Sequence, residues 1–291
     1  MRSLATFATT AALLLVPPVA GDLPGAWAET PDFVRHELVE ALPILGRLDT
    51  GATEIVVRGD LRPRRARRML RLARQAYDDI NERFVLHPAA RDPGAEKAGS
   101  PAARPPVDFC LFDSSPEYER FVSAIFGERD LSSYGFYMSS HRLVVVNIAR
   151  SSNSVPHEMV HPLLGDDFPG MPTWFNEGLG ALYGKARERR GGMRFGVNYR
   201  LRHLKAAIRQ DAVPGFEQLT SSSYHDVHGP QERTYYALGR YLLLYLERRD
   251  TLDDFYRDLR REEPTPARQL ALLRRYIDRD EFIRWARRLK R

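Results

Sequence analysis

In the stretch from Val155 to His161, two histidines are four residues apart and a glutamate follows the first of them. On a helix, residues at this spacing lie on one face, about one turn apart. His157 and His161 can therefore bind a single tetrahedral metal ion, and this H-E-x-x-H pattern is typical of zinc. Glu158 would then point at the water that the ion activates and act as its general base.

Two histidines leave a catalytic zinc ion short of a protein ligand, because such sites usually offer three ligands and a water. Glu177 is the candidate third ligand, 16 residues after His161. The turn Asp167-Phe168-Pro169-Gly170 between them would let a second helix fold back on the first. Asp166 and Asp167 are alternative ligands within the turn itself. Glu177 could also be an ordinary surface carboxylate.

The segment Trp174-Phe175-Asn176-Glu177-Gly178 resembles the W-x-N-E-G segment of the gluzincin zinc metallopeptidases. In that family the glutamate of this segment is the third zinc ligand, which implies the same role for Glu177. Tyr236-Ala237-Leu238-Gly239 is similar to the Y-x-x-G of the aminopeptidase branch, where the tyrosine hydroxyl assists the transition state. Residues from about 54 to 260 as a whole resemble the compact bacterial peptidase MA-like domains.

The resemblance leaves some roles open. His225 and His228, in the polar loop before Tyr236, are alternative donors to the oxyanion, although we expect both to face solvent. Tyr236 could also be a plain core aromatic. Gly180 stands where the family commonly has alanine, and we expect it to loosen its helix by up to about 1 kcal/mol without affecting chemistry. The substrate-amine motif of the aminopeptidases, Gly-x-Met-Glu-Asn, has no match, so exopeptidase activity is not implied.

Hydrophobic patterning predicts an α+β fold that positions these residues. Upstream of the metal helix we expect a small sheet with helices, and a loose loop over His87–Pro106. Strands are predicted at 54–58, 107–112 and 142–148, and helices at 64–84 and 116–126. Downstream the pattern is almost entirely helical. Helices are predicted at 173–183, 199–210, 234–249, 252–260, 267–276 and 281–289.

This order suggests an α/β lobe of about residues 50–165 and a helical lobe of about 166–291, with a cleft between them. The strand 142–148 runs directly into the metal helix. If its edge is free, it could pair with an extended peptide substrate, whereas an internal position would leave no such edge.

The N-terminus has the features of a cleaved signal peptide: Arg2, a short apolar stretch over Leu4–Val16, and Ala26-Trp27-Ala28 before Glu29. A cut after Gly21 is an alternative, and so is a buried N-terminal helix. We expect a mature protein of residues 29–291 that is secreted or periplasmic. Cys110 is the single cysteine, so an intramolecular disulfide is impossible. Its apolar surroundings predict a buried, unreactive thiol.

The formal net charge is +6, and the last 35 residues carry twelve basic and six acidic side chains. These are expected to form solvated helix faces, or to associate weakly with an anionic envelope surface. Nucleic acid is not an expected partner, since no base-stacking motif accompanies the arginines.

The sequence therefore predicts a secreted zinc metallopeptidase that acts on a peptide or protein substrate. Two alternatives remain. One is a non-catalytic zinc-containing binding module of the same fold, and the other is an amidase acting on cell-wall peptide. The sequence does not determine the oligomeric state.

Overall fold

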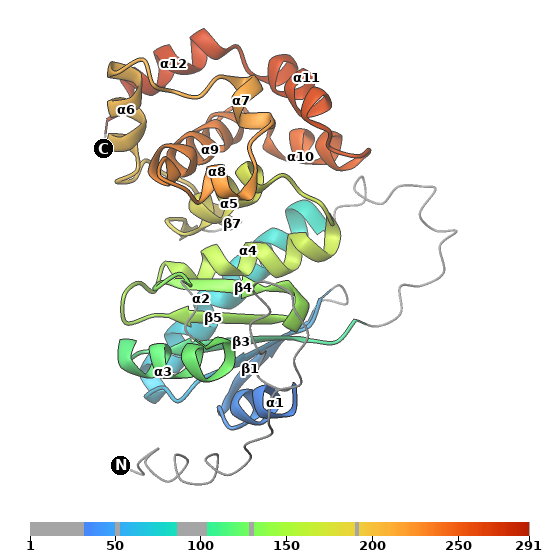
Figure 1. The fold of residues 1–291 in the computed structure, drawn as a ribbon, viewed down its shortest axis with the longest axis vertical. Coiled ribbons are helices and arrows are strands. Elements are labelled where there is room, and N and C mark those ends of the chain that lie inside the picture. The colour runs from blue at the N-terminus through green and yellow to red at the C-terminus, as the bar shows by residue number, and fades with distance from the viewer. Residues whose placement is uncertain (1–31, 50–52, 86–103, 128–130, 190–191, 291) are drawn as a thin grey trace, which may run out of the picture.

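The computed structural model describes residues 32–49, 53–85, 104–127, 131–189 and 192–290. The expected signal peptide and most of the expected loop at 87–106 lie outside these ranges. The fold is α+β: a mixed sheet with its helices precedes the helix that carries the histidines, and a mostly helical region follows it (Figure 1).

A five-stranded sheet forms the first part of the molecule, with strand order β1-β2-β3-β5-β4. The three central strands, β2 (Ile55–Arg58), β3 (Val107–Phe112) and β5 (Leu143–Asn147), are parallel, and they confirm the three predicted strands. Their nearly continuous apolar sequences suit strands that are covered on both faces. The edge strands β1 (Ile44–Leu48) and β4 (Gly135–Met138) are antiparallel to their neighbours and were not predicted.

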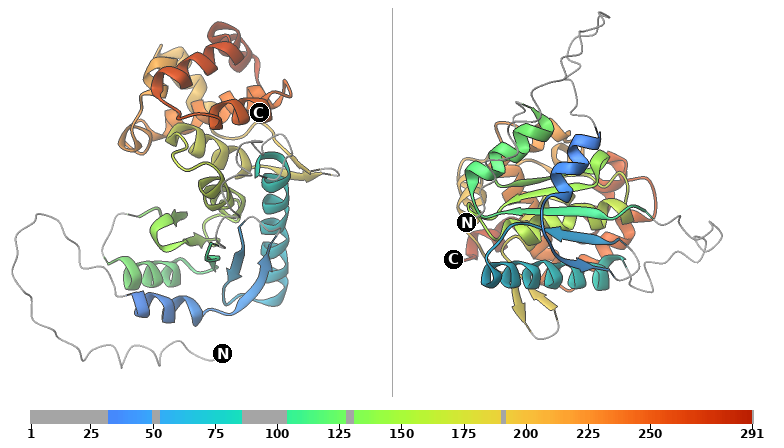
Figure 2. Two further views of the ribbon diagram at one scale, coloured as in Figure 1. Left: turned by 90° about the vertical axis from the view of Figure 1, so that its right-hand side faces the viewer. Right: turned by 90° about the horizontal axis from the view of Figure 1, so that it is seen from below.

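Helices cover both faces of this sheet, because alternate side chains of each strand point to opposite sides. Phe109 and Leu111 pack toward α2 (Pro63–Ile80). Cys110 and Phe112 pack toward α1 (Asp32–Glu40) and α3 (Ser115–Phe126). The right-hand view of Figure 2 shows α2 on one side of the sheet and α1 and α3 on the other. Cys110 is free and buried, as expected, and burial raises the pKa of its thiol.

The helix predicted at 64–84 is present as α2 and continues into a π-helical turn, Asn81–Val85. Its buried residues recur at helical spacing, whereas most of its arginines are exposed. Packing of α2 against α4 (Ser154–Asp167) joins the sheet to the histidine-bearing helix. The strand β5 ends at Asn147, seven residues before α4 begins, so the sheet fixes where that helix starts.

The six helices predicted downstream are all present: α5 (Thr173–Tyr183), α6 (Leu201–Arg209), α9 (Glu232–Glu247), α10 (Leu252–Arg260), α11 (Pro266–Tyr276) and α12 (Arg279–Arg288). Three smaller features were not predicted: the hairpin β6 (Arg187–Arg189) and β7 (Gly192–Arg194), and the short helices α7 (Phe216–Thr220) and α8 (Tyr224–Val227). Within the described part of the chain, no helix has both the length and the apolar character needed to cross a membrane.

Candidate metal centre

Helix α4 presents His157, Glu158 and His161 as a group. One donor atom from each lies within 4.8 Å of the other two, which is close enough for a shared metal ion. Glu158 and His161 are buried, and the side chain of His157 is 17% exposed. The helical spacing expected from the sequence is therefore present, and this group could hold a metal ion.

Glu177 reaches the same place from α5. Its Oε2 lies 3.5 Å from Nε2 of His157, and its Oε1 lies 3.4 Å from Nε2 of His228. Gly170, with a φ of 85°, helps the chain to reverse between α4 and α5, as a residue with a side chain adopts this conformation only at a cost. The Oε2 atom is buried and accepts no hydrogen bond from any described residue. A buried carboxylate oxygen in this state suits a bound cation.

Asn176 orients one of the histidines. Its Oδ1 lies 2.9 Å from Nδ1 of His161. An amide oxygen can only accept a hydrogen bond, so Nδ1 carries the proton and Nε2 keeps its lone pair for a ligand. This role was not predicted, although the position of Asn176 directly before Glu177 in the motif could have suggested it.

The surroundings of Gly180 contradict the expectation that this glycine does not affect the site. A Cβ atom built at this position would lie 2.7 Å from Cε1 and 2.9 Å from Nδ1 of His157. The glycine therefore leaves room for the imidazole of a candidate ligand, and it does affect the site. Glycine was expected only to loosen the helix, because the sequence does not show which side chain crosses that face of α5.

Tyr236 lies beside the histidines because α9 and α5 pack backbone to backbone. A Cβ on Gly239 would lie 2.8 Å from the carbonyl oxygen of Trp174, and one on Gly178 would lie 3.0 Å from the carbonyl carbon of Gly239. Gly178 and Gly239 therefore allow the two helices to approach this closely. The ring of Tyr236 is nearly parallel to that of His157, at 9°, with their centroids 6.4 Å apart.

His228 does not face solvent as expected. It follows α8 and contacts Glu177, and its Nδ1 lies 3.4 Å from the hydroxyl of Tyr236. Tyr224 stacks on its ring at 4.1 Å. His225, by contrast, is exposed, as expected. The two histidines are three residues apart in a polar segment, and only the turn of α8 decides which one points inward.

The environments of the two glutamates differ. Burial raises the pKa of Glu158, and the charge of Glu177 adds to this effect against the opposing charges of His157 and His161. Burial alone would also raise the pKa of Glu177, but the surrounding histidines hold it well below the usual range. The pKa of His157 is raised because contact with Glu177 outweighs burial. Glu177 is thus kept ionised, while Glu158 binds a proton more readily than an ordinary glutamate.

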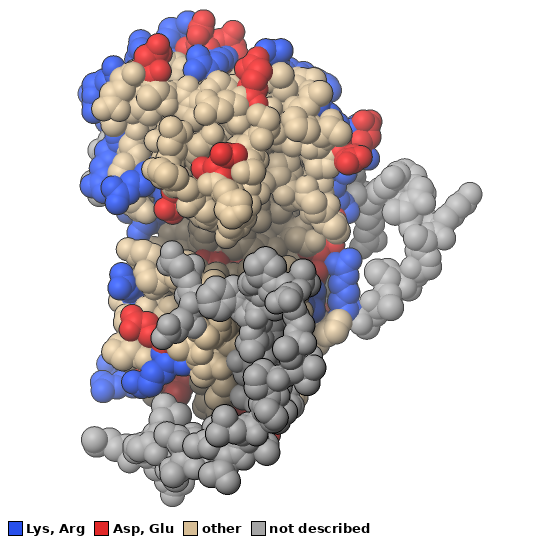
Figure 3. Space-filling model, in the orientation of Figure 1, with Lys and Arg blue, Asp and Glu red and all other residues tan. Residues whose placement is uncertain are grey.

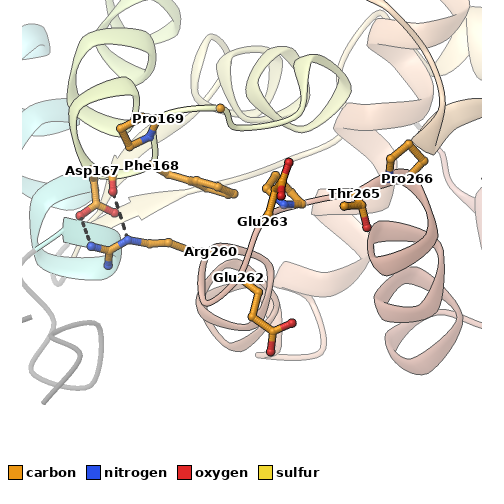
Figure 4. Close-up of a pocket in the computed structure, with 10 residues that line it drawn as sticks. Asp167, Phe168, Pro169, Arg260, Glu262, Glu263, Thr265 and Pro266 are labelled. Carbon is orange, nitrogen blue, oxygen red and sulfur yellow. Dashed lines mark hydrogen bonds and ion pairs between the residues drawn. The ribbon is translucent and has the colours of Figure 1, made fainter. Parts of the chain in front are cut away.

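Asp166 and Asp167 are not part of this group. Asp166 accepts hydrogen bonds from Arg142 at 2.9 Å, and Tyr256 donates to Asp167 at 2.6 Å. Asp167 also pairs with Arg260 at 2.9 Å (Figure 4). The pair borders a separate cavity of about 710 Å³ between the α4–α5 turn and the α10–α11 connection. Both aspartates are therefore used in tertiary contacts, and neither is placed to replace Glu177.

The strand β5 is internal, between β3 and β4, so it offers no free edge. The edge strand on that side is β4, and it passes close to the site: a Cβ on Gly135 would lie 3.1 Å from Oε1 of Glu158. Figure 3 shows a recess between the sheet part and the helical part of the molecule, and in the same orientation Figure 1 places α4 and β4 below it and α8 above it. The site elements thus border this recess.

No family model matches the chain, and no curated protein matches it.

Proposed function

We propose that this chain is a zinc-dependent metallopeptidase of the gluzincin type. The observation that carries the proposal is that three imidazoles and two carboxylates converge from α4, α5 and the segment before α9. Their environments push the pKa values of the two glutamates in opposite directions. Two such carboxylates suit two different roles, one as a permanent anion and one as a proton carrier.

Nε2 of His157, Nε2 of His161 and the carboxylate of Glu177 would hold the ion. Two imidazoles and one carboxylate form a donor set that suits zinc. Two observations support this assignment: the hydrogen bond from His161 to Asn176, and the buried oxygen of Glu177 that accepts no hydrogen bond from a described residue. When bound, zinc would supply a Lewis acid that polarises a carbonyl group and activates water.

Glu158 would act as the general base. Its carboxylate would take a proton from the attacking water and deliver it to the nitrogen of the leaving amine. The raised pKa favours this exchange, because a carboxyl group that binds protons more readily is a better match to chemistry near neutral pH.

Tyr236 would donate a hydrogen bond to the oxygen of the carbonyl under attack. Burial raises its pKa well above the usual value, and the charge of Glu177 adds to this, so the phenol keeps its proton. His228, which contacts both Tyr236 and Glu177, is the rival donor.

An extended peptide would bind along β4. This strand is the outer strand of the described sheet on the side of the site, and its unpaired backbone groups can hydrogen bond to a peptide. Because Gly135 has no side chain, the backbone of β4 can approach the carboxylate of Glu158 closely, which would bring a peptide paired with β4 near the general base.

The test distinguishes residues needed for zinc binding from residues needed for peptide cleavage. Glu158→Gln should keep one zinc per chain but lose about 10²–10⁴ in cleavage rate, as expected when a general base is removed. Glu177→Ala should lose the metal, whereas the matched Asp167→Ala should keep it. Zinc content is measured by atomic absorption, and cleavage with a diverse peptide library. Loss of zinc from Glu158→Gln with retention in Glu177→Ala would move the ligand role to Glu158 and refute the mechanism. If no peptide is cleaved by the zinc-loaded wild type, that result would favour the binding module over the peptidase.

We also propose that the protein is exported, on the basis of the Arg2, Leu4–Val16 and Ala26–Ala28 pattern. N-terminal sequencing of the exported protein should begin at Glu29. A protein that keeps Met1 in the cytoplasmic fraction would contradict the export proposal.

A further inference from the structure

Beside the candidate site lies a guanidinium group that has no carboxylate partner among the described residues. Arg200 directly precedes α6, and its Cζ lies 4.7 Å from the ring centroid of Tyr236. That ring is in turn nearly parallel to the ring of His157, with 6.4 Å between their centroids. The positive charge of Arg200 acts on His157, where it opposes protonation. Arg200 is thus part of the wall of the site.

Further cations surround the same position. The ring of Tyr199, which is 36% exposed, has Arg200 at 5.4 Å, Arg202 at 5.9 Å and the Nζ of Lys185 at 6.0 Å from its centroid. We call Lys185, Arg200 and Arg202 the Arg200 cluster. Among the residues that the structure describes, no carboxylate lies within ion-pair distance of these three side chains. Two partly buried arginines elsewhere, Arg83 and Arg142, each pair with an acidic residue.

The cluster has an electrostatic cost that an anion would remove. Like charges gathered around one aromatic ring repel one another, and the face of the ring offsets only part of that repulsion. Burial lowers the pKa of Lys185, and the neighbouring charges of Arg240 and Arg200 add to this effect. Arg240 itself is buried and donates to the carbonyl oxygens of Leu182 and Gly196, so it is not available to a ligand. Figure 3 shows basic side chains over the left-hand edge of the upper part, where Figure 1 places α6.

We infer that the Arg200 cluster is a substrate subsite that binds a carboxylate of the peptide, with Arg200 as the specificity-determining residue. The planar guanidinium can donate two parallel hydrogen bonds to a carboxylate. Such a group lies either on an acidic side chain or at the free C-terminus of the peptide. This inference rests on the proposed peptidase function, since it concerns the substrate of the same site.

The test measures binding without turnover. Zinc-loaded Glu158→Gln protein is titrated with three fluorescent, N-acetylated peptides of equal length. The first is amidated and contains glutamine, the second is amidated and has glutamate in its place, and the third contains glutamine and has a free C-terminus. We expect one of the carboxylate peptides to bind about tenfold more tightly than the neutral peptide, and this advantage to shrink as salt is added. The peptide that binds more tightly identifies the source of the carboxylate.

Variants that each remove one positive charge, made in the Glu158→Gln background, show which residue causes the preference for a carboxylate. Arg200→Gln should abolish the preference, whereas Arg209→Gln, which removes an exposed arginine at the far end of α6, should preserve it. Circular dichroism verifies folding, and Lys185→Gln, which should reduce the preference, replaces Arg200→Gln if that variant is unfolded. Equal binding of all three peptides, or a preference that survives Arg200→Gln, would overturn the inference. Because binding is measured without cleavage, these results are independent of whether the wild type hydrolyses peptides.

Discussion

Tyr236 is the single residue for which geometry and chemistry most directly suggest a catalytic test. Its hydroxyl lies 3.4 Å from Nδ1 of His228, and its ring is nearly parallel to that of His157. Burial and the charge of Glu177 raise its pKa. A donor that strengthens its hydrogen bond only as charge develops lowers kcat when it is removed and leaves substrate binding nearly unchanged.

We therefore expect Tyr236→Phe to keep zinc and thermal stability but to lose about 10²–10³ in kcat, or about 3–4 kcal/mol. Steady-state kinetics on a cleaved peptide provide the measurement. Tyr235→Phe is the matched control, because Tyr235 is a buried neighbour on the same helix that does not contact the candidate ligands. Full activity in Tyr236→Phe together with loss of activity in His228→Ala would assign the donor role to His228.

At the scale of elements, α5 is the helix on which the site depends. It packs against α4 on one side and against α9 on the other, and its glycines allow both approaches. Arg240 of α9 is buried and donates to the carbonyl oxygens of Ala181 and Leu182 at the C-terminal end of α5. These carbonyls lack partners within the helix, so the arginine satisfies them and fixes α5 against α9.

Gly180→Ala tests this close packing. The added methyl group would overlap the imidazole of His157, which must then rotate or shift. We expect zinc affinity to fall about 10- to 100-fold, the range typical of changes that misorient a ligating histidine. Zinc titration against a competing chelator provides the measurement. Gly165→Ala is the control, since it lies on α4 with nothing within 4 Å of the added Cβ, and its affinity should be unchanged. Equal affinities for both variants would show that the site tolerates the shift.

At the scale of the whole molecule, the metal would connect the two parts of the fold. The proposed ligands come from α4, which packs on the sheet side, and from α5, which packs on the helical side. No disulfide can do this, because the chain has one cysteine. A ligand that binds only the native state stabilises it by mass action.

We expect removal of zinc by a chelator to lower the Tm by on the order of 10 °C, corresponding to about 4 kcal/mol at a free zinc concentration a thousandfold above Kd. Differential scanning calorimetry with and without chelator measures the shift. His161→Ala should show almost no response to chelator, because it has lost a proposed ligand. A large shift in that variant would mean that the stabilising ion binds elsewhere.

The sequence alone determined the α+β order of elements and the grouping on α4. Both depend on local spacing: continuous apolar runs give the central strands, and a separation of four residues brings His157 and His161 to one helix face. It did not reveal the edge strands β1 and β4 or the short helices α7 and α8. These elements are too short for a periodic signal and are stabilised mainly by their neighbours.

Only the tertiary structure decided which residues from distant segments approach the histidines. His228 faces inward while His225 is exposed, Gly180 makes room for His157, and Arg200 stacks on Tyr236. None of these contacts has a signature in the sequence, because each depends on how one helix packs against another. Asp166 and Asp167 are close to the histidines in sequence but are not part of the site, because Arg142 and Arg260 hold them elsewhere. Local spacing determines which side chains share one face of a helix, whereas packing between helices determines which residues of other elements those side chains contact.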